Sequence, residues 1–165
     1  MYDYVMMLCF DDATEARIKK LILKLGNFGL PASRKPWPPH ITIALFKGIE
    51  ISELIKQSDE LFADSTSFPI SFTSFNDFHQ RVFYLQPQTS NDLLAIYSKT
   101  IAKLGNYFYQ QKQPIFTPHV TLGIWAEVRT AKEILKDECT VFAGNVASLR
   151  IYSRQVVLQK CYNFT

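Results

Sequence analysis

The order of expected helices and strands in the first half of this chain is repeated in the second half at a nearly constant distance. Helix starts are expected at Asp12 and Ser52 in the first half, and at Ser90 and Thr130 in the second. Both pairs of starts lie 78 positions apart, and a fixed shift across several elements is typical of a duplicated unit. Two units are too few for a solenoid. The sequence therefore predicts one domain over residues 1–165, made of two lobes, about 1–78 and 79–165, related by an approximate twofold axis.

Apolar runs and turn residues set the other boundaries. We expect strands over 4–10, 40–46, 69–75, 81–85, 119–125, 146–152 and 155–159, and the second helix over 52–63. The helical spacing predicts that the first helix buries Ile18, Leu21, Ile22 and Leu25. The same spacing predicts that the third helix buries Leu93, Leu94, Tyr97, Ile101 and Leu104. A polar stretch before the fourth strand predicts a tight turn with His79 exposed at its tip.

The composition is that of a globular domain with a sizeable core. Hydrophobic residues make up 47% of the chain and charged residues 20%. No apolar run approaches the roughly 20 residues of a membrane span, and the N-terminus has no signal-peptide pattern. The net charge of +3 is too small to indicate nucleic-acid binding by itself. The three cysteines, Cys9, Cys139 and Cys161, are odd in number and lack C-x-x-C spacing. We therefore expect a cytoplasmic location and no disulfide framework.

Two of the three histidines lie in matching segments, Pro39-His40-Ile41-Thr42-Ile43 and Pro118-His119-Val120-Thr121-Leu122. On a strand, residues i and i+2 point to the same face. Each histidine should therefore project together with its threonine, while the aliphatic residues between and after them turn towards the core. The predicted twofold axis would bring two imidazoles and two hydroxyl groups to one shared site.

This set of groups suits the cleavage of a phosphodiester. One imidazole can take a proton from water or a hydroxyl group while the other protonates the leaving oxygen near neutral pH. The threonine hydroxyls can donate hydrogen bonds to the phosphate. Neither a metal ion nor a protein nucleophile is required. We therefore predict that His40, Thr42, His119 and Thr121 are the catalytic residues.

Both segments have the form H-x-[TS]-x, and in this respect the sequence resembles the two-histidine (2H) phosphoesterases, in particular the 2′-5′ RNA ligase-like (LigT-like) cyclic phosphodiesterases. The resemblance covers nearly the whole chain. It implies an α+β, bilobal duplicated fold in which two antiparallel-rich sheets form a central cleft and helices pack on the outside. It also implies hydrolysis of a 2′,3′-cyclic phosphate or a related cyclic phosphodiester without metal or cofactor, and a reversible 2′-5′ RNA ligase activity. By the same resemblance, His119 activates water and His40 protonates the leaving group.

Residues near the two motifs are candidates for binding the rest of the substrate. A basic side chain can contact phosphate, and an aromatic ring can stack on a base. The candidates are Arg34, Lys35, Trp37, Tyr84, Phe116 and Tyr152. For Trp37 and Phe116, a purely structural role in the core fits the sequence as well.

Two other functions stay open at this point. The chain could be a non-catalytic RNA- or nucleotide-binding module on the same fold, or a metal-dependent hydrolase, although the sequence offers no evident third metal ligand. We expect a monomer whose partner is an RNA or nucleotide substrate, and no membrane association. A mononucleotide, a tRNA fragment, an RNA end, an ADP-ribose cyclic phosphate and a 2′-5′ oligoadenylate all fit as substrates.

Overall fold

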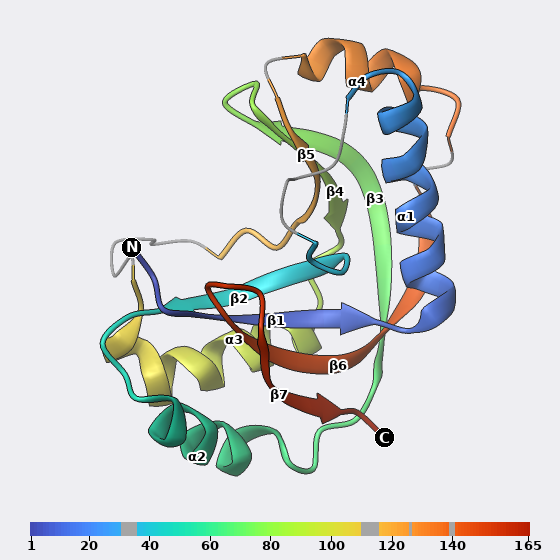
Figure 1. Ribbon diagram of the computed structural model, residues 1–165. Coiled ribbons are helices and arrows are strands. Elements are labelled where there is room, and N and C mark those ends of the chain that lie inside the picture. Colours follow the sequence, from blue (N-terminus) through green and yellow to red (C-terminus); the bar gives the residue numbers. More distant parts are fainter. Residues whose placement is uncertain (31–35, 110–115, 126, 139–140) are drawn as a thin grey trace.

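The computed structural model describes residues 1–30, 36–109, 116–125, 127–138 and 141–165 (Figure 1). The β-α-β-α-β order occurs twice, as the sequence predicted. The first set is β1 (Tyr4–Phe10), α1 (Asp12–Asn27), β2 (His40–Phe46), α2 (Ile51–Phe62) and β3 (Phe68–Phe78). The second set is β4 (Val82–Pro87), α3 (Asn91–Leu104) with a 3-10 turn η1 (Gly105–Tyr107), β5 (Val120–Ile124), α4 (Val128–Ile134) and β6 (Phe142–Ser153). A last strand, β7 (Leu158–Asn163), follows.

All strand pairs are antiparallel, which confirms the α+β class. The strands form one seven-stranded sheet in the order β2-β1-β6-β3-β4-β5, with β7 paired to β6. The two sheets expected from the sequence are thus joined into one. Backbone hydrogen bonds connect the two parts through β6, because its first part pairs with β3 and its later part pairs with β1 and β7.

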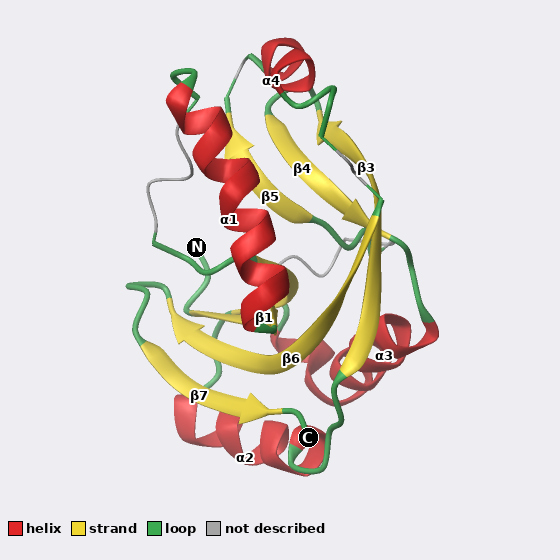
Figure 2. Cartoon of the chain, turned by 90° about the vertical axis from the view of Figure 1, so that its right-hand side faces the viewer, coloured by secondary structure: helices red, strands yellow, loops and turns green. Residues whose placement is uncertain are grey.

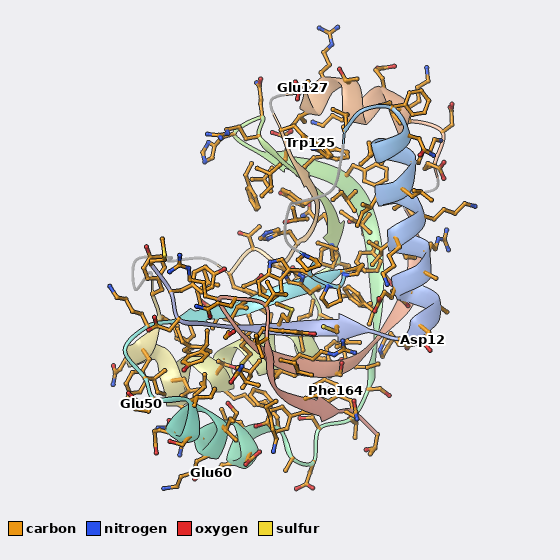
Figure 3. The ribbon with its side chains drawn as sticks, viewed as in Figure 1. Asp12, Glu50, Glu60, Trp125, Glu127 and Phe164 are labelled. Carbon is orange, nitrogen blue, oxygen red and sulfur yellow. The ribbon has the colours of Figure 1, made fainter. Side chains whose placement is uncertain are left out.

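The two repeats interlock by exchanging their third strands. β3 of the first repeat pairs with β4 of the second, and β6 of the second pairs with β1 of the first. One half of the sheet therefore contains β2, β1, β6 and β7, and the other contains β3, β4 and β5. Figure 3 labels Trp125, next to β5, and Phe164, next to β7, in these two separate halves.

Three of the four helices pack on one sheet half each, and α1 packs on both. α4 contacts β4, whereas α3 contacts β2 and α2 contacts β7; α1 contacts β1 and β6 as well as β5 and α4. Figure 2 shows α4 at one end of the molecule, near β4 and β5, and α2 at the other end beside β7. Within the described residues, no helix is both long and apolar enough to span a membrane.

The main core lies between the helices and the sheet. Alternate residues of β1, such as Met6, Leu8 and Phe10, belong to this core and are almost fully buried. At the junction of the two halves, the Phe72 ring lies 5.7 Å from that of Phe10 and 4.7 Å from that of Phe142. The other residues of β1 face the opposite side, where Val5, Met7 and Cys9 form a small second cluster with Tyr152. β1 is thus buried on both faces, as its continuous apolar sequence requires.

One predicted helix face is partly wrong. α3 buries Leu93, Ile96, Thr100 and Leu104, whereas Leu94 and Ile101 are 43% and 44% exposed. The buried stripe passes through Thr100 and not Ile101, and the Thr100 hydroxyl donates to the Ile96 carbonyl oxygen at 2.7 Å. This internal hydrogen bond satisfies the hydroxyl, so that a polar residue can occupy the buried stripe. In α1, the predicted burial of Ile18, Leu21 and Leu25 is confirmed, and Ile22 is half-buried.

The start of α1 is attached to β6 close to the junction with β3. Asp11 accepts the Thr14 N–H at 2.8 Å as the helix N-cap and accepts the Asn145 side-chain amide at 3.0 Å. Thr14 is buried, and its hydroxyl oxygen accepts the Asn145 N–H at 3.1 Å. These contacts hold the first turn of α1 directly against Gly144 and Asn145.

Gly144→Ala should therefore destabilise the fold. An added methyl group at Gly144 would lie 2.3 Å from the Thr14 hydroxyl oxygen, and such overpacking costs about 1–3 kcal/mol of unfolding free energy. Gly26→Ala in α1 is the matched control, because its methyl group would meet no atom within 4 Å and helix propensity should add up to about 1 kcal/mol. Denaturant unfolding measures both. Equal stabilities of the two variants would contradict this packing.

Candidate active site

His40 and His119 occupy equivalent places at the starts of two strands. His40 is the first residue of β2, and His119 directly precedes β5. The neighbouring Ile41 and Val120 are completely buried. Because side chains alternate along a strand, each histidine lies on the sheet face opposite to the main core. We call this side of the sheet the histidine face.

Both imidazoles are held by the same hydrogen bond. Nδ1 of His40 lies 2.7 Å from the Pro38 carbonyl oxygen, and Nδ1 of His119 lies 2.9 Å from the Thr117 carbonyl oxygen. A carbonyl oxygen can only accept, so Nδ1 carries the hydrogen in each ring. In the neutral form, Nε2 then has a free lone pair and can take a proton; in the charged form it can give one. The two rings are therefore prepared for the same chemistry.

Burial lowers the pKa of both histidines. For His40, burial is the main cause, the Pro38 carbonyl opposes it, and the charge of His119 lowers the pKa further. For His119, burial is again the main cause and the Thr117 carbonyl opposes it. The effect of His119 on His40 means that the two imidazoles are close enough to interact electrostatically, although they come from different halves of the sheet.

The two threonines are half-buried on the histidine face. Thr42 lies opposite Met7 of β1, and Thr121 lies opposite Tyr84 of β4 in the strand register. Within the part of the chain that the structure describes, neither hydroxyl makes a hydrogen bond to another group. Each is therefore available to donate a hydrogen bond to a bound anion.

Aromatic rings pack against His40. Trp37 lies edge-to-face against the imidazole with ring centroids 6.2 Å apart, and it also lies edge-to-face against Tyr152 at 5.4 Å. Tyr152 is buried and belongs to the small cluster on the histidine face. These two candidate substrate-binding residues thus lie beside the first motif.

A second aromatic pair packs against His119. Tyr84 lies 5.3 Å from the imidazole and Phe78 lies 4.9 Å from it, while the Tyr84 and Phe78 rings stack at 4.4 Å. Of these two, the sequence analysis singled out only Tyr84. Phe78 occupies the position in β3 that Tyr152 has in β6, 74 residues later, so an alignment of the third strands of the two repeats would have revealed it.

The remaining candidates have different positions. Phe116 stacks on Tyr97 of α3, with centroids 4.3 Å apart and planes 7° from parallel, and it packs against the main core. Among the described residues, its ring therefore stacks on a helix residue and not on either histidine. Arg34 and Lys35 lie outside the described residues. His79 is exposed in the β3–β4 turn with φ of 53°.

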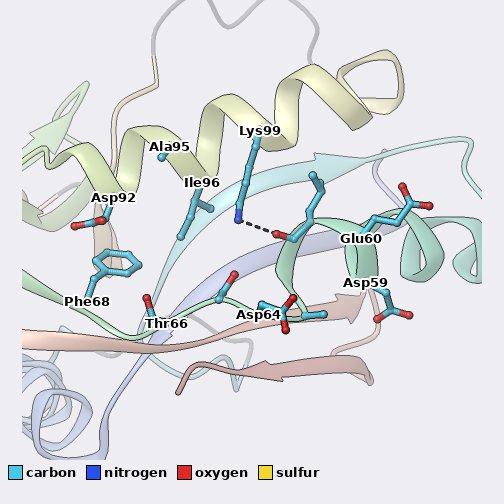
Figure 4. Close-up of a pocket in the computed structure, with 12 residues that line it drawn as sticks. Asp59, Glu60, Asp64, Thr66, Phe68, Asp92, Ala95, Ile96 and Lys99 are labelled. Carbon is cyan, nitrogen blue, oxygen red and sulfur yellow. Dashed lines mark hydrogen bonds between the residues drawn. The ribbon is translucent and has the colours of Figure 1, made fainter.

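A separate cavity of about 500 Å³ lies between α2 and α3 (Figure 4). Asp59, Asp64 and Asp92 contribute carboxylates to its lining, and Lys99 donates to the Leu61 carbonyl oxygen at 2.8 Å. Neither histidine motif contributes to this cavity. Across the described ranges, no group of three or more His, Cys, Asp or Glu side chains could hold a metal ion.

Similarity to known proteins extends over most of the chain. The family model of the 2'-5' RNA ligase superfamily matches residues 10–156, a range that includes both motifs. A search of curated proteins finds no match.

Solved structures share the fold at low sequence identity. The TT0787 protein of Thermus thermophilus has 13% identity and a TM-score of 0.69, over 98% of this chain and 97% of that one. E. coli LigT in complex with 3'-AMP has 16% identity and a TM-score of 0.66, over 99% and 98%. Usb1 of Kluyveromyces marxianus with uridine monophosphate has 11% identity and a TM-score of 0.54, over 98% of each chain. With the family model spanning most of its length, the chain belongs to the 2'-5' RNA ligase superfamily.

Proposed function

We propose that this protein is a metal-independent cyclic phosphodiesterase that hydrolyses a 2′,3′-cyclic phosphate at an RNA end or on a nucleotide, or a related cyclic phosphodiester. The observation that carries the proposal is the pair of imidazoles with equivalent Nδ1 hydrogen bonds, with His119 near enough to lower the pKa of His40. Membership in a superfamily named for RNA ligation supports a phosphoester substrate. So do the structures of related folds with 3'-AMP and uridine monophosphate.

The reaction needs two proton transfers. In our assignment, Nε2 of His119 takes a proton from water as the water oxygen bonds to phosphorus. The bond between phosphorus and one ribose oxygen breaks, and the protonated Nε2 of His40 gives its proton to that oxygen. Thr42 and Thr121 donate to the non-bridging oxygens, where negative charge grows. The products are a phosphomonoester and a free hydroxyl group, and proton exchange with solvent restores both imidazoles.

The same groups can serve a different nucleophile. A ribose hydroxyl group from a second RNA end takes the place of water, so 2′-5′ RNA ligation is the second activity that we assign to this site. We further propose that the protein acts in the cytoplasm and as a monomer. The free thiols of Cys9 and Cys161 fit the cytoplasm, where thiols stay reduced.

The direct test is to incubate the purified protein with 2′,3′-cyclic nucleotides with and without EDTA. We expect conversion to a nucleoside monophosphate at the same rate in both. Loss of turnover in EDTA would instead support a metal-dependent hydrolase, and binding without turnover would support a nucleotide-binding module. Chromatography of the product would identify it as the 2′- or 3′-phosphate.

The pH dependence of kcat/KM should be bell-shaped, with its optimum below pH 6.5. One imidazole must be neutral and the other charged, and an ordinary histidine has a pKa of about 6.5. Burial disfavours the charged form, so the pKa of both His40 and His119 is lowered and the singly protonated pair forms at more acidic pH. A bound phosphate favours the imidazolium, so the optimum of kcat should lie at higher pH than that of kcat/KM. An optimum of kcat/KM above pH 7 would contradict the buried site.

A further inference from the structure

The strand register defines two rows of side chains across the histidine face. Residues directly opposite each other in antiparallel strands lie on the same face. In one row, His40 of β2 is followed by Cys9 of β1 and Ser148 of β6. In the next row, Thr42 is followed by Met7 and Arg150. Arg150 is therefore two strands away from Thr42, a backbone separation of about 10 Å.

The guanidinium of Arg150 is directed towards the row that contains His40. Its Nε donates to the Ser148 hydroxyl at 3.3 Å. Burial raises the pKa of the Cys9 thiol to about 12, and the charge of Arg150 opposes this rise, so the guanidinium also lies near Cys9. Cys9 is the direct neighbour of His40 across the β1–β2 pair. The arginine thus places a positive charge on the histidine face, beside the direct neighbour of His40.

This charge has no acidic counterpart. Arg150 is half-buried, yet no ion pair joins it to a carboxylate among the described residues. A charged side chain that is partly withdrawn from water normally has an opposite charge beside it. The residues paired with Arg150 on the two neighbouring strands, Met7 and Cys161, are not carboxylates. An anionic group of a bound ligand could therefore form the ion pair with the guanidinium.

The other half of the site lacks this charge. The position equivalent to Arg150, 74 residues earlier in β3, is Asn76, which lies opposite Tyr84 just as Arg150 lies opposite Met7. The Asn76 side-chain amide donates to the Gln86 side-chain oxygen at 3.1 Å. The position equivalent to Arg150 on the His119 side thus carries a neutral side chain, whereas the His40 side carries a positive charge.

We infer that Arg150 binds a second, non-reacting phosphate of the substrate while the cyclic phosphate lies between His40 and His119. This inference rests on the proposed function. It favours substrates with at least two phosphates over a cyclic mononucleotide. Guanidinium groups bind phosphate with two parallel hydrogen bonds. Arg150 already bonds the side chains of Ser148 and Tyr152, and of its five N–H groups those not used in these two bonds can bind a phosphate. The second phosphate can belong to an RNA chain or to a molecule such as ADP-ribose cyclic phosphate.

Two dinucleotides test the inference directly. Both are ApA with a terminal 2′,3′-cyclic phosphate, and one has a neutral methylphosphonate in place of its internal phosphodiester. The wild-type protein should prefer the charged substrate, and Arg150→Gln should lower kcat/KM for it about ten- to a hundredfold more than for the neutral one. Arg150→Lys should restore part of the preference. ADP-ribose cyclic phosphate, measured in parallel, distinguishes an RNA substrate from a diphosphate. Arg129→Gln, at an exposed position in α4, is the matched control and should keep the wild-type preference.

Salt dependence tests the same contact without any variant. For the wild type, the logarithm of kcat/KM should fall with log salt concentration more steeply for the charged dinucleotide, by about 0.7 for one phosphate contact. Equal slopes, or an equal loss of kcat/KM on both substrates in Arg150→Gln, would overturn the inference and leave the proposed function intact.

Calorimetry with the uncyclised 3′-phosphate forms of the two dinucleotides separates the phosphate site at Arg150 from the proposed function. If nothing is hydrolysed but the charged form binds more tightly through Arg150, the phosphate site stands and the proposed function is wrong. If Arg150→Gln changes the affinity for neither form, the inference is wrong.

Discussion

His40→Ala and His119→Ala should each lower kcat by about 10²–10⁴-fold, the usual contribution of one general acid or base. Each change removes the only nitrogen of its motif that can exchange a proton with the substrate, since Nδ1 is engaged with a backbone carbonyl. Initial rates on a 2′,3′-cyclic nucleotide measure the effect. The double variant should be little slower than the slower single variant, because groups that act in one transition state are not additive.

The third histidine provides the control for this prediction. His79 lies exposed in the β3–β4 turn with φ of 53°, a conformation that asparagine tolerates well. His79→Asn should therefore retain wild-type activity. If the losses of the two single variants multiply cleanly in the double variant, the two imidazoles do not share one proton-transfer mechanism.

Thr42→Val and Thr121→Val should lower kcat by more than they raise KM. Valine keeps the shape and β-propensity of threonine but removes the hydroxyl donor. If the hydroxyl binds a phosphate oxygen whose charge grows in the transition state, its loss costs about 2–4 kcal/mol, or roughly 30- to 1,000-fold in kcat. Steady-state kinetics of the purified variants separates the two constants.

Serine at the same positions is the matched control. Thr42→Ser and Thr121→Ser keep a hydroxyl group on the histidine face and should keep most of kcat. A rise in KM with unchanged kcat in the valine variants would mean that the hydroxyls bind the ground state and the transition state equally. The threonines would then be binding groups without a role in catalysis.

The repeated motifs made the two strands that carry the histidines predictable. Local alternation alone requires Ile41 and Val120 to turn inwards, and both are completely buried. His40 and Thr42 then have to share the other face. The duplicated order of helices and strands could also be predicted, because the capping residues and glycines that mark helix ends act on a few neighbouring positions only. α1 begins at Asp12, as expected, with Asp11 as its N-cap.

Long-range pairing was not predictable in the same way. No local signal indicates that β3 pairs with β4 and β6 with β1, and this exchange brings Phe78 to His119 and Arg150 to the row of Thr42. Both residues are therefore absent from the sequence-based candidates. Phe116 is the converse case: its position near the second motif indicated substrate contact, whereas stacking on Tyr97 directs it to α3.

A substrate with an activated leaving group tests the central claim, proton transfer by the two histidines, most directly. Such a leaving group departs without protonation, so a variant that lacks only the general acid should regain activity on it. With wild-type protein as reference, we expect His40→Ala to recover most of its rate on a p-nitrophenyl phosphodiester, and His119→Ala to stay inactive. Recovery of His119→Ala alone would reverse the two roles and keep the mechanism. Recovery of neither variant would contradict the claim that these imidazoles exchange protons with the substrate.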